Sequence, residues 1–294
     1  MGVQHIKTYI FDEDIILSGA NLSDWYFVNR QDRYILIKNE REISSYFEKL
    51  IEEISKISYK FNGNLCIPPI SNDLNEHIQS LIAPKIASKK ETDTWLFPSV
   101  QMGPYNIIQD QIITQYLFGI PNSHLSISSA YFNFPKNYID ILLNSNDCKI
   151  ITASPEANGF FGSKGFSKHV PTIYSMIEED FYRQTMKSKV KIFEYKKEKW
   201  TFHAKGLWMS FSAQDDPMIT MIGSPNFGHR SVNLDLEAQA IILTENQELR
   251  KKLKKERDFI FQDSEKVDLN TFDKHYRKPT ILMTFLKKFL KNYM

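Results

Sequence analysis

Two stretches of the chain, HIKTYIFDEDIILSGAN (residues 5–21) and HAKGLWMSFSAQDDPMITMIGSPN (residues 203–226), follow the same order of residue types. Each opens with His-x-Lys, continues through apolar runs and ends in Gly-x-Asn or Gly-Ser-x-Asn. The second copy has 23 positions between His and Asn against 16, because the polar segment SFSAQDDP, an expected loop, adds length. An acidic residue, Asp32 or Glu237, then follows the Asn after 11 positions in both copies. A single His-x-Lys is common, but the doubled set predicts two equivalent halves.

The rest of the chain alternates short β-rich runs with helical patterns, which predicts an α/β fold. The segment between about 60 and 104 is rich in Asn, Pro and Gly and indicates the connection between the halves. Helices are expected over EISSYFEKLIEEISKIS (42–58) and VPTIYSMIEEDFYRQTMKS (170–188). Strands are expected over IKTYIF (6–11), IILSGA (15–20), HLSISSAYF (124–132), KIITASP (149–155), KVKIFEY (189–195), TFHAKGLWM (201–209), MITMIGS (218–224) and LEAQAIIL (236–243).

The composition is that of a globular protein, with 294 residues of which 42% are hydrophobic. The formal net charge of +2 gives no argument for a nucleic-acid partner. No apolar run approaches the roughly 18 residues needed to span a bilayer, and the start of this chain carries no targeting pattern. Cys66 and Cys148 have neither metal-ligand nor disulfide spacing, so we expect buried structural cysteines and a reducing compartment.

The two motifs resemble the paired HxKx4D…GSxN motifs of the phospholipase D superfamily. The segments GANLSDWYFVNRQDRY (19–34), ASPEANGFFGSKGFSKHVPTIY (153–174) and WTFHAKGLW (200–208) are similar, more closely, to the eukaryotic phosphatidylglycerophosphate synthases. This resemblance, from residue 4 to about 260, implies a pseudo-twofold pair of mixed-sheet halves with flanking helices, the first half incomplete. It also implies transfer of a phosphatidyl group from CDP-diacylglycerol to glycerol 3-phosphate, on the matrix side of the mitochondrial inner membrane. Asp12, at the place of the superfamily Asp, lies in an expected hairpin turn; the second copy has Ser210 there.

The motifs supply what phosphoryl transfer requires: a nucleophile, a proton donor for the leaving oxygen and positive charge around the phosphoryl oxygens. Residues two apart in a strand point to one side, so each His-x-Lys is expected to present imidazole and ammonium together. By analogy His5 is the nucleophile and His203 the acid and base, an assignment that symmetry makes reversible, and no metal or other cofactor is required. The lysines and asparagines would hold oxygens, and the acids would orient the imidazoles. The predicted catalytic residues are His5, Lys7, Asn21, Asp32, His203, Lys205, Asn226 and Glu237.

Other polar residues are weaker candidates. Lys164 and Lys168 lie in the Gly-rich loop GFFGSKGFSKH (159–169), which would suit an anion or simply be solvated, and Ser224 stands in the second motif, so these three are possible substrate contacts. Arg30 and Arg230 follow the two Asn residues irregularly, and we interpret them as structural ion-pair partners. The remaining histidines are interpreted as structural: His77, His124, His169, His229 and His275.

The predicted domain division is 1–103 for the C-terminal part of the first half plus the connection, 104–262 for the second half, and 263–294 for a basic amphipathic tail. The last segment, TILMTFLKKFLKNYM (280–294), interleaves apolar residues with lysines. This pattern is typical of a helix in peripheral contact with an anionic membrane, and a helix docked on the core fits it equally.

Spacing alone leaves other functions open. A phosphodiesterase or nuclease of the same superfamily would use the same histidines with water as acceptor, and a noncatalytic membrane-associated module is a third alternative. About 100 residues of the second half precede His203, whereas four residues precede His5. We therefore expect the sequence to be the C-terminal part of a longer protein, missing on the order of 100 residues; the alternative is a natural short form. The strand carrying His5 would then expose an unpaired edge and an uncovered apolar face.

Overall fold

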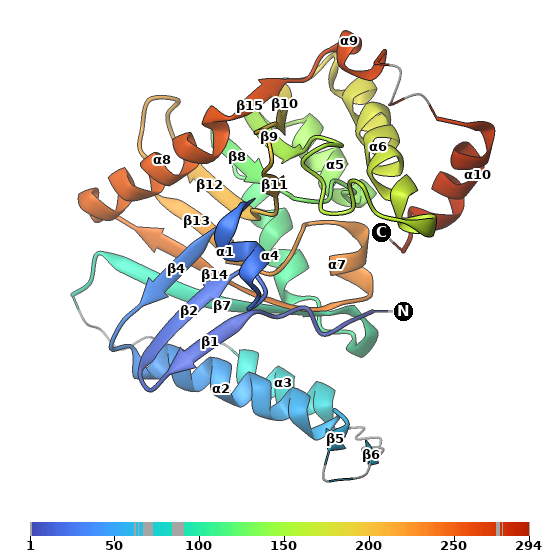
Figure 1. The fold of residues 1–294 in the computed structure, drawn as a ribbon. Helices are drawn as coiled ribbons and strands as arrows, with labels where there is room; N and C mark the ends of the chain where they lie inside the picture. The colour runs from blue at the N-terminus through green and yellow to red at the C-terminus, as the bar shows by residue number, and fades with distance from the viewer. Residues whose placement is uncertain are drawn as a thin grey trace.

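The computed structural model describes residues 2–61, 63, 65–66, 73–83, 91–274, 277 and 279–293. Within them, the chain forms an eight-stranded mixed sheet surrounded by helices, with a three-stranded sheet beside it (Figure 1). The predicted α/β class is confirmed. The predictions for the side chain of Cys66 and for His275 lie outside the described residues, whereas Cys148 is buried with a free thiol, as expected.

The large sheet comes mainly from the second half and has the strand order β15-β10-β9-β8-β12-β13-β14-β7. Its neighbouring strands β8, β9 and β10 are parallel, with α5 and α6 as crossovers, and the other pairs are antiparallel. A core of buried apolar residues, including Phe118, Ile150 and Phe181, packs this sheet against its helices. The strands are β7 (Thr94–Met102), β8 (His124–Ser128), β9 (Asp147–Ala153), β10 (Val190–Tyr195), β12 (Gly206–Ser210), β13 (Ile219–Gly223), β14 (Leu236–Thr244) and β15 (Ser264–Lys266). The helices are α4 (Gln109–Phe118), α5 (Lys136–Leu143), α6 (Val170–Thr185), α7 (His229–Asn233), α8 (Gln247–Gln262), α9 (Leu269–Phe272) and α10 (Ile281–Leu290), with 3-10 turns at Gly103–Tyr105 and Gly165–His169.

Strand β7 lies in the segment that the sequence suggested to be only a connection. It pairs with β14 along nine residues, with Pro98 opposite Ala240. Proline has no N–H to donate and is confined to edge strands, and β7 is the last strand of the sheet order. The interpretation of the whole segment as a connection was therefore wrong for residues 94–102. The division of the chain into 1–103, 104–262 and 263–294 stays a prediction.

The first half contributes the small sheet, in the order β1-β2-β4. Ile15 and Leu17 on β2 are buried against Phe47 and Leu50 of α2, which covers one face. Among the described residues, β1 and β4 each pair only with β2. The sequence predicted an unpaired edge on the strand that carries His5; this was wrong for His5, which precedes β1, although β1 itself has one unpaired edge among the described residues. The elements are β1 (Thr8–Phe11), β2 (Asp14–Ser18), α1 (Asp24–Val28), β3 (Arg30–Gln31), β4 (Tyr34–Ile37), α2 (Arg41–Lys56), β5 (Lys60–Phe61), β6 (Leu65–Cys66) and α3 (Leu74–Ile82).

The residue that follows the motif Asn differs in exposure between the halves. Phe227 is 1% exposed within the large core, whereas Leu22, at the same place in the first half, is 78% exposed. The short helices α1 and α7 begin three residues after Asn21 and Asn226 respectively. The halves are thus equivalent in local structure and unequal in how much protein covers them.

Two short parallel pairings join the halves. On one side β3 pairs with β11 (Thr201–Phe202), which places Gln31 opposite Phe202. On the other side an isolated parallel bridge places Gln4 opposite Leu236. The first pairing lies directly before Asp32 of one motif and His203 of the other. The second pairing lies directly before Glu237 and His5 in the same way. These pairings therefore set the relative positions of the catalytic candidates.

The C-terminal segment packs against the second half and carries no long apolar helix. Leu286 and Leu290 of α10 contact the large core, and the Lys287 ammonium lies 2.7 Å from Asp180 on α6. In Figure 1 α10 lies beside the lower part of α6. None of the described helices is long and apolar enough to cross a bilayer.

Candidate active site

The two motif histidines are each bound by the acid of the other half. The Nδ1 atom of His5 lies 2.9 Å from Oε2 of Glu237, and Nδ1 of His203 lies 2.8 Å from Oδ2 of Asp32. Both carboxylates are fully buried, and each fixes the orientation of its imidazole. We call these contacts the crossed histidine–acid pairs. The sequence predicted the role of the acids, but spacing did not indicate which acid belongs to which histidine.

Backbone hydrogen bonds hold the crossed pairs in place. The His203 N–H donates to the Gln31 carbonyl at 2.8 Å, and the His5 N–H donates to the Leu236 carbonyl at 2.9 Å. Asp32 follows Gln31 in the chain, and Glu237 follows Leu236. These backbone hydrogen bonds therefore place each carboxylate next to the histidine ring of the other half. The same device is used twice, which supports the pseudo-twofold relation of the motifs.

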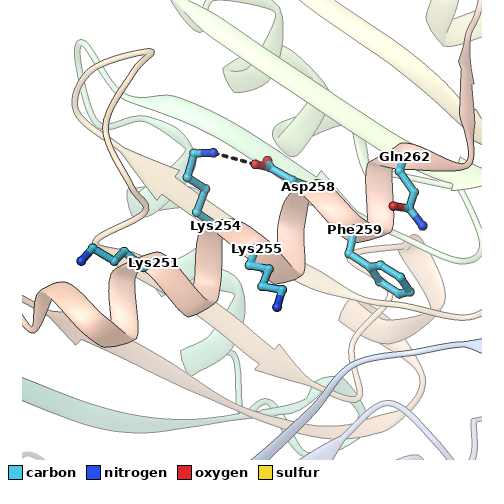
Figure 2. A pocket seen from close by; sticks show the side chains of 6 residues that line it. All are labelled: Lys251, Lys254, Lys255, Asp258, Phe259 and Gln262. Carbon is cyan, nitrogen blue, oxygen red and sulfur yellow. Dashed lines mark hydrogen bonds and ion pairs between the residues drawn. The ribbon is translucent and has the colours of Figure 1, made fainter.

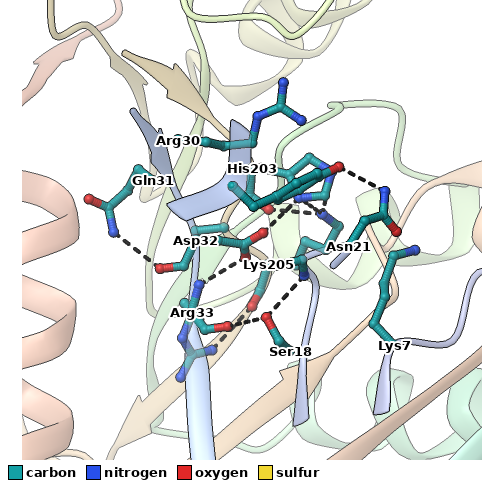
Figure 3. A network of polar contacts seen from close by, with 12 residues as sticks. Lys7, Ser18, Asn21, Arg30, Gln31, Asp32, Arg33, His203 and Lys205 are labelled. Carbon is teal, nitrogen blue, oxygen red and sulfur yellow. Dashed lines mark hydrogen bonds and ion pairs between the residues drawn. The ribbon is translucent and has the colours of Figure 1, made fainter. Parts of the chain in front are cut away.

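The lysines lie beside the histidines, although not by the expected strand geometry. The prediction that each His-x-Lys lies within a strand was wrong, because β1 begins at Thr8 and β12 at Gly206. Gly206, the first residue of β12, has φ of +137°, a conformation that side-chain-bearing residues rarely adopt, so the backbone changes course directly after Lys205. The expected proximity is nevertheless present: Nζ of Lys205 lies 2.8 Å from Nδ1 and 3.1 Å from Nε2 of His203 (Figure 3). In the first motif, the Lys7 ammonium donates to the His5 carbonyl at 2.5 Å.

Burial and mutual repulsion change the pKa values of the site. Burial lowers the pKa of Lys205 to about 7 and that of Lys7 to about 8. The pKa of His203 falls to about 3, first through burial and then through the charge of Lys205. Burial alone would raise the pKa of Glu237, but its interaction with the His5 imidazole holds that pKa below its ordinary value. The site thus crowds cations together, which an anionic ligand would relieve.

The motif asparagines are not equivalent in environment. Asn21 is exposed and its amide donates to the Tyr26 hydroxyl at 3.0 Å. The side-chain oxygen of Asn226 is buried and has no hydrogen-bond partner among the described residues. Buried polar atoms are usually satisfied, so this oxygen is available for a donor that arrives with a ligand.

The weaker substrate candidates lie in different settings. Lys164 and Lys168 are exposed on the loop before α6. Ser224 is 1% exposed, and its hydroxyl donates to the Ala238 carbonyl at 3.2 Å. Ser224 also helps to hold the pKa of Glu237 below its ordinary value. Ser224 therefore adjoins the catalytic candidate Glu237, whereas Lys164 and Lys168 contact none of the catalytic candidates among the described residues.

Other sequence interpretations can be compared with the contacts. Asp12 occupies the β1–β2 turn with φ of +55°, as expected of a turn residue, and Ser210 ends β12.

Arg230 pairs with Asp235 at 2.8 Å, as predicted. Arg30 was predicted to form an ion pair, which was wrong among the described residues: its Nε donates to Thr201 Oγ1 at 3.0 Å instead. The histidines interpreted as structural have these contacts: His77 with Glu53, His124 with Asp147, His169 with the ring of Phe166, and His229 through its backbone N–H with Asn133.

Sequence reasoning missed the aromatic rings around His203. Tyr26, from α1, meets the imidazole edge to face with ring centres 5.0 Å apart, and Tyr131 does so at 6.0 Å. The first half supplies one ring and the second half the other. Tyr26 lies five residues after Asn21 within the motif region, so that position could have been flagged, but nothing in the sequence pointed to Tyr131.

Arg33 was also missed, although it follows Asp32 directly. Its guanidinium is 1% exposed and binds Glu256 of α8 at 2.9 Å and the Met221 carbonyl at 2.7 Å. A further hydrogen bond of 3.3 Å reaches the Lys205 carbonyl. Arg33 thus fastens the segment that carries Asp32 to the strands that follow Lys205, and it is a positioning residue for the site.

One group in the site has a donor set that could hold a cation. Ligand atoms of His5, Asp235 and Glu237 lie within 4.8 Å of one another. His5 and Glu237 are already bound to each other, and Asp235 is bound to Arg230, so these contacts account for the cluster without a metal. Elsewhere, a surface hollow on α8 contains none of the candidate catalytic residues (Figure 2). It is lined by Lys251, Lys254, Lys255, Asp258, Phe259 and Gln262.

The chain is similar to several known proteins. Residues 120–258 match the family model described as cardiolipin synthase, PLD-like domain. A Dictyostelium discoideum protein named probable CDP-diacylglycerol–glycerol-3-phosphate 3-phosphatidyltransferase is 40% identical across all of this chain and 57% of its own length. The human mitochondrial protein of the same name is 34% identical across all of this chain and 61% of its own length. The chain therefore spans about three fifths of the length of these relatives.

A solved structure supports the fold. The phosphatidylserine synthase of Haemophilus influenzae superimposes with a TM-score of 0.73 and 23% identity, over 99% of this chain and 68% of that one. The resemblance at this identity concerns the mixed α/β architecture alone.

Proposed function

We propose that the paired motifs of this chain transfer a phosphatidyl group from CDP-diacylglycerol to glycerol 3-phosphate and release CMP, because residues 120–258 match a PLD-like family model and the relatives named above share its whole length. The observation that carries the proposal is the pair of crossed histidine–acid contacts, which brings two oriented imidazoles and two buried lysines into one site. The names of the relatives supply the substrates. Phosphatidylglycerophosphate, the product, leads to phosphatidylglycerol and cardiolipin.

The reaction proceeds in two steps. In the first, Nε2 of His5 attacks the phosphorus of the phosphatidyl group, a P–N bond forms, and the P–O bond to CMP breaks. The electron pair stays on the CMP oxygen, which receives a proton from His203. In the second, His203 removes the proton from a hydroxyl of glycerol 3-phosphate, whose oxygen attacks the phosphorus and displaces His5. Each histidine returns to its starting state, and no cofactor is used.

The environment of the histidines supports these roles. Glu237 binds Nδ1 of His5 and leaves Nε2 for the attack, and His5 is the more exposed of the two, at 22% against 6% for the side chains. Before substrate binds, the pKa of His203 is about 3, so this imidazole is neutral. The negative charge of a pyrophosphate opposes the lysine charges and raises that pKa, so His203 gains its proton with substrate in place. Lys7, Lys205 and the two motif asparagines hold the phosphoryl oxygens.

The experiment is an assay of CMP release from CDP-diacylglycerol with and without glycerol 3-phosphate. Transferase activity predicts release that depends on the acceptor. Equal release in its absence, with phosphatidic acid as the product, would identify a hydrolase instead. A covalent intermediate further predicts that labelled CMP exchanges into CDP-diacylglycerol without acceptor. An active enzyme that shows no exchange would point to direct displacement.

We place this activity at a membrane in the mitochondrion. Relatives are named mitochondrial, and the matrix side of the inner membrane is our proposal by resemblance. The helix α10 supports peripheral contact with anionic lipid, because Phe285 and Phe289 are 68% and 70% exposed beside its lysines, while Leu286 and Leu290 hold it on the core. Docking and membrane contact, which the sequence left as alternatives, are compatible because different residues of the same helix serve each.

A further inference from the structure

Arg30 is a cation at the site with no carboxylate partner among the described residues. Its Nε donates to Thr201, and its guanidinium carbon lies 4.5 Å from the ring centre of Tyr26. Within the described part of the chain, no acceptor lies within hydrogen-bond distance of its two Nη atoms. By contrast, Arg33 and Arg230 each bind a carboxylate. Arg30 is therefore held firmly by one side of its guanidinium while the other side is open.

The side of the Arg30 guanidinium that has no hydrogen-bond acceptor faces the loop that follows β9. A Cβ built on Gly159 would be 3.5 Å from Nη2 of Arg30 and 2.9 Å from the Tyr131 hydroxyl. The guanidinium and this hydroxyl thus flank the same glycine. Because the second distance is too short for a Cβ, only glycine lets the loop backbone approach so closely. We call this place the Arg30 corner. It combines the guanidinium of Arg30, the phenol of Tyr131 and the glycine backbone at Gly159.

The Arg30 corner adjoins the catalytic histidine. Tyr26, which carries the Arg30 guanidinium on its ring, and Tyr131 both contact the His203 imidazole through their rings. Figure 3 shows Arg30 above His203, with its guanidinium directed away from Lys205. A ligand bound to Arg30 would therefore extend outward from the reacting centre.

Such a half-buried, unpaired guanidinium suits a phosphate group. Arginine binds phosphate through two parallel N–H donors, and here the two Nη atoms provide that pair. On the proposed function, the substrates carry three phosphates, of which only the phosphatidyl phosphate reacts between the histidines. We infer that Arg30, together with the Tyr131 hydroxyl and the Gly159 backbone, binds a phosphate that is not transferred. That group belongs either to the cytidine nucleotide or to glycerol 3-phosphate.

The test measures the binding of CMP and of glycerol 3-phosphate, separately, by calorimetry to the wild type, Arg30→Gln, Arg30→Lys and Thr201→Val. Loss of a charged hydrogen-bond pair predicts that one ligand binds Arg30→Gln about 10- to 100-fold more weakly. Weaker binding of CMP alone identifies the nucleotide phosphate, and weaker binding of glycerol 3-phosphate alone identifies the acceptor phosphate. Arg30→Lys should recover part of the affinity. Thr201→Val, which removes the supporting hydrogen bond but keeps the charge, should change affinity less than threefold.

Unchanged affinity of a folded Arg30→Gln protein for both ligands would overturn the inference. A wild type that binds neither ligand would count against the proposed function rather than against the Arg30 corner. In that case inorganic pyrophosphate is the probe: weaker binding to Arg30→Gln than to wild type supports a phosphate site at Arg30, and equal binding excludes it. Melting temperatures of the variants show whether each one is folded.

Discussion

His5 and Glu237 are 232 positions apart in the chain, and the imidazole of one binds the carboxylate of the other at 2.9 Å. The mirrored contact between His203 and Asp32 spans 171 positions at 2.8 Å. Each histidine is thus oriented by a residue of the opposite half. The site exists only where the two halves meet, and its chemistry depends on how firmly they are joined.

Removing the charge of either acid is expected to impair catalysis at the opposite histidine. Asp32→Asn and Glu237→Gln keep the size of the side chain but no longer favour the correct imidazole tautomer. We expect each to lower kcat by up to about 10⁴-fold, the loss seen when a catalytic histidine loses its orienting carboxylate. His5→Ala and His203→Ala should abolish transfer. The measurement is acceptor-dependent CMP release.

The matched control for the acids is Asp12→Asn, because Asp12 occupies the β1–β2 turn rather than the site. It should leave kcat within about twofold of wild type. If Asp12→Asn were as damaging as Asp32→Asn, the turn carboxylate would have to act in the reaction, contrary to its placement. Near-normal turnover of Asp32→Asn would refute the role of the crossed pairs.

Binding of a phosphate ligand is expected to be coupled to proton uptake. The pKa values of Lys205 and Lys7 are lowered to about 7 and about 8, so both are partly deprotonated at pH 8. An anion favours the charged amines and raises both pKa values, so protons are taken up as it binds. Calorimetry at pH 8 in two buffers of different ionisation enthalpy gives the number of protons.

The same linkage fixes the direction of the pH dependence. Affinity for CMP should fall as pH rises from 7 to 9, because binding must then protonate more amine. Lys205→Met should reduce both the proton uptake and this slope. Proton release on binding, or an affinity that increases with pH, would contradict the picture of buried amines that await an anion.

Arg33 is expected to be a major contributor to stability. Arg33→Met removes the ion pair with Glu256 and leaves two backbone carbonyls without their donor. Breaking a buried pair costs about 3 kcal/mol or more, which chemical denaturation can measure. Lys254→Gln, which breaks the exposed pair with Asp258, is the control and should cost less than about 1 kcal/mol. Similar losses for the two variants would mean that Arg33 does not fasten the halves.

The exposed face of α10 is expected to bind anionic membranes. Replacing Phe285 and Phe289 with serine should weaken cosedimentation with vesicles that contain anionic lipid, and more so than with neutral vesicles. The control replaces Ile112 and Tyr116 of α4, which are 57% and 73% exposed on a helix without lysine. If both double variants bound anionic vesicles like wild type, α10 would not be the membrane contact.

Local pattern predicted most of the framework. The runs around the motifs predicted β2, β13 and β14 within a few residues, and helical periodicity predicted α2 and α6. The doubled motif also predicted the residues that now converge on one site. These features follow from the order of residues over short distances, which a sequence displays directly.

The missed features depend on contacts between distant segments. Pro98 suggested a loop, but an edge strand tolerates it because the missing N–H faces away from the ladder. Arg33 had no local signal, since the partners of its guanidinium lie 172 or more positions away. The crossing of the acids was likewise invisible, because identical spacing in both copies fits pairing within a half as well as between halves.

The crossed histidine–acid pairs also predict where substitutions that restore a damaged site should arise. A change at Asp32 removes the carboxylate that orients the imidazole of His203, so compensating substitutions are expected near β11 and β12, around a residue 171 positions further along the chain. A change at Glu237 should likewise be rescued near His5. The two halves therefore cannot change in sequence independently, because a change that moves the acid of one half also moves the catalytic histidine of the other half.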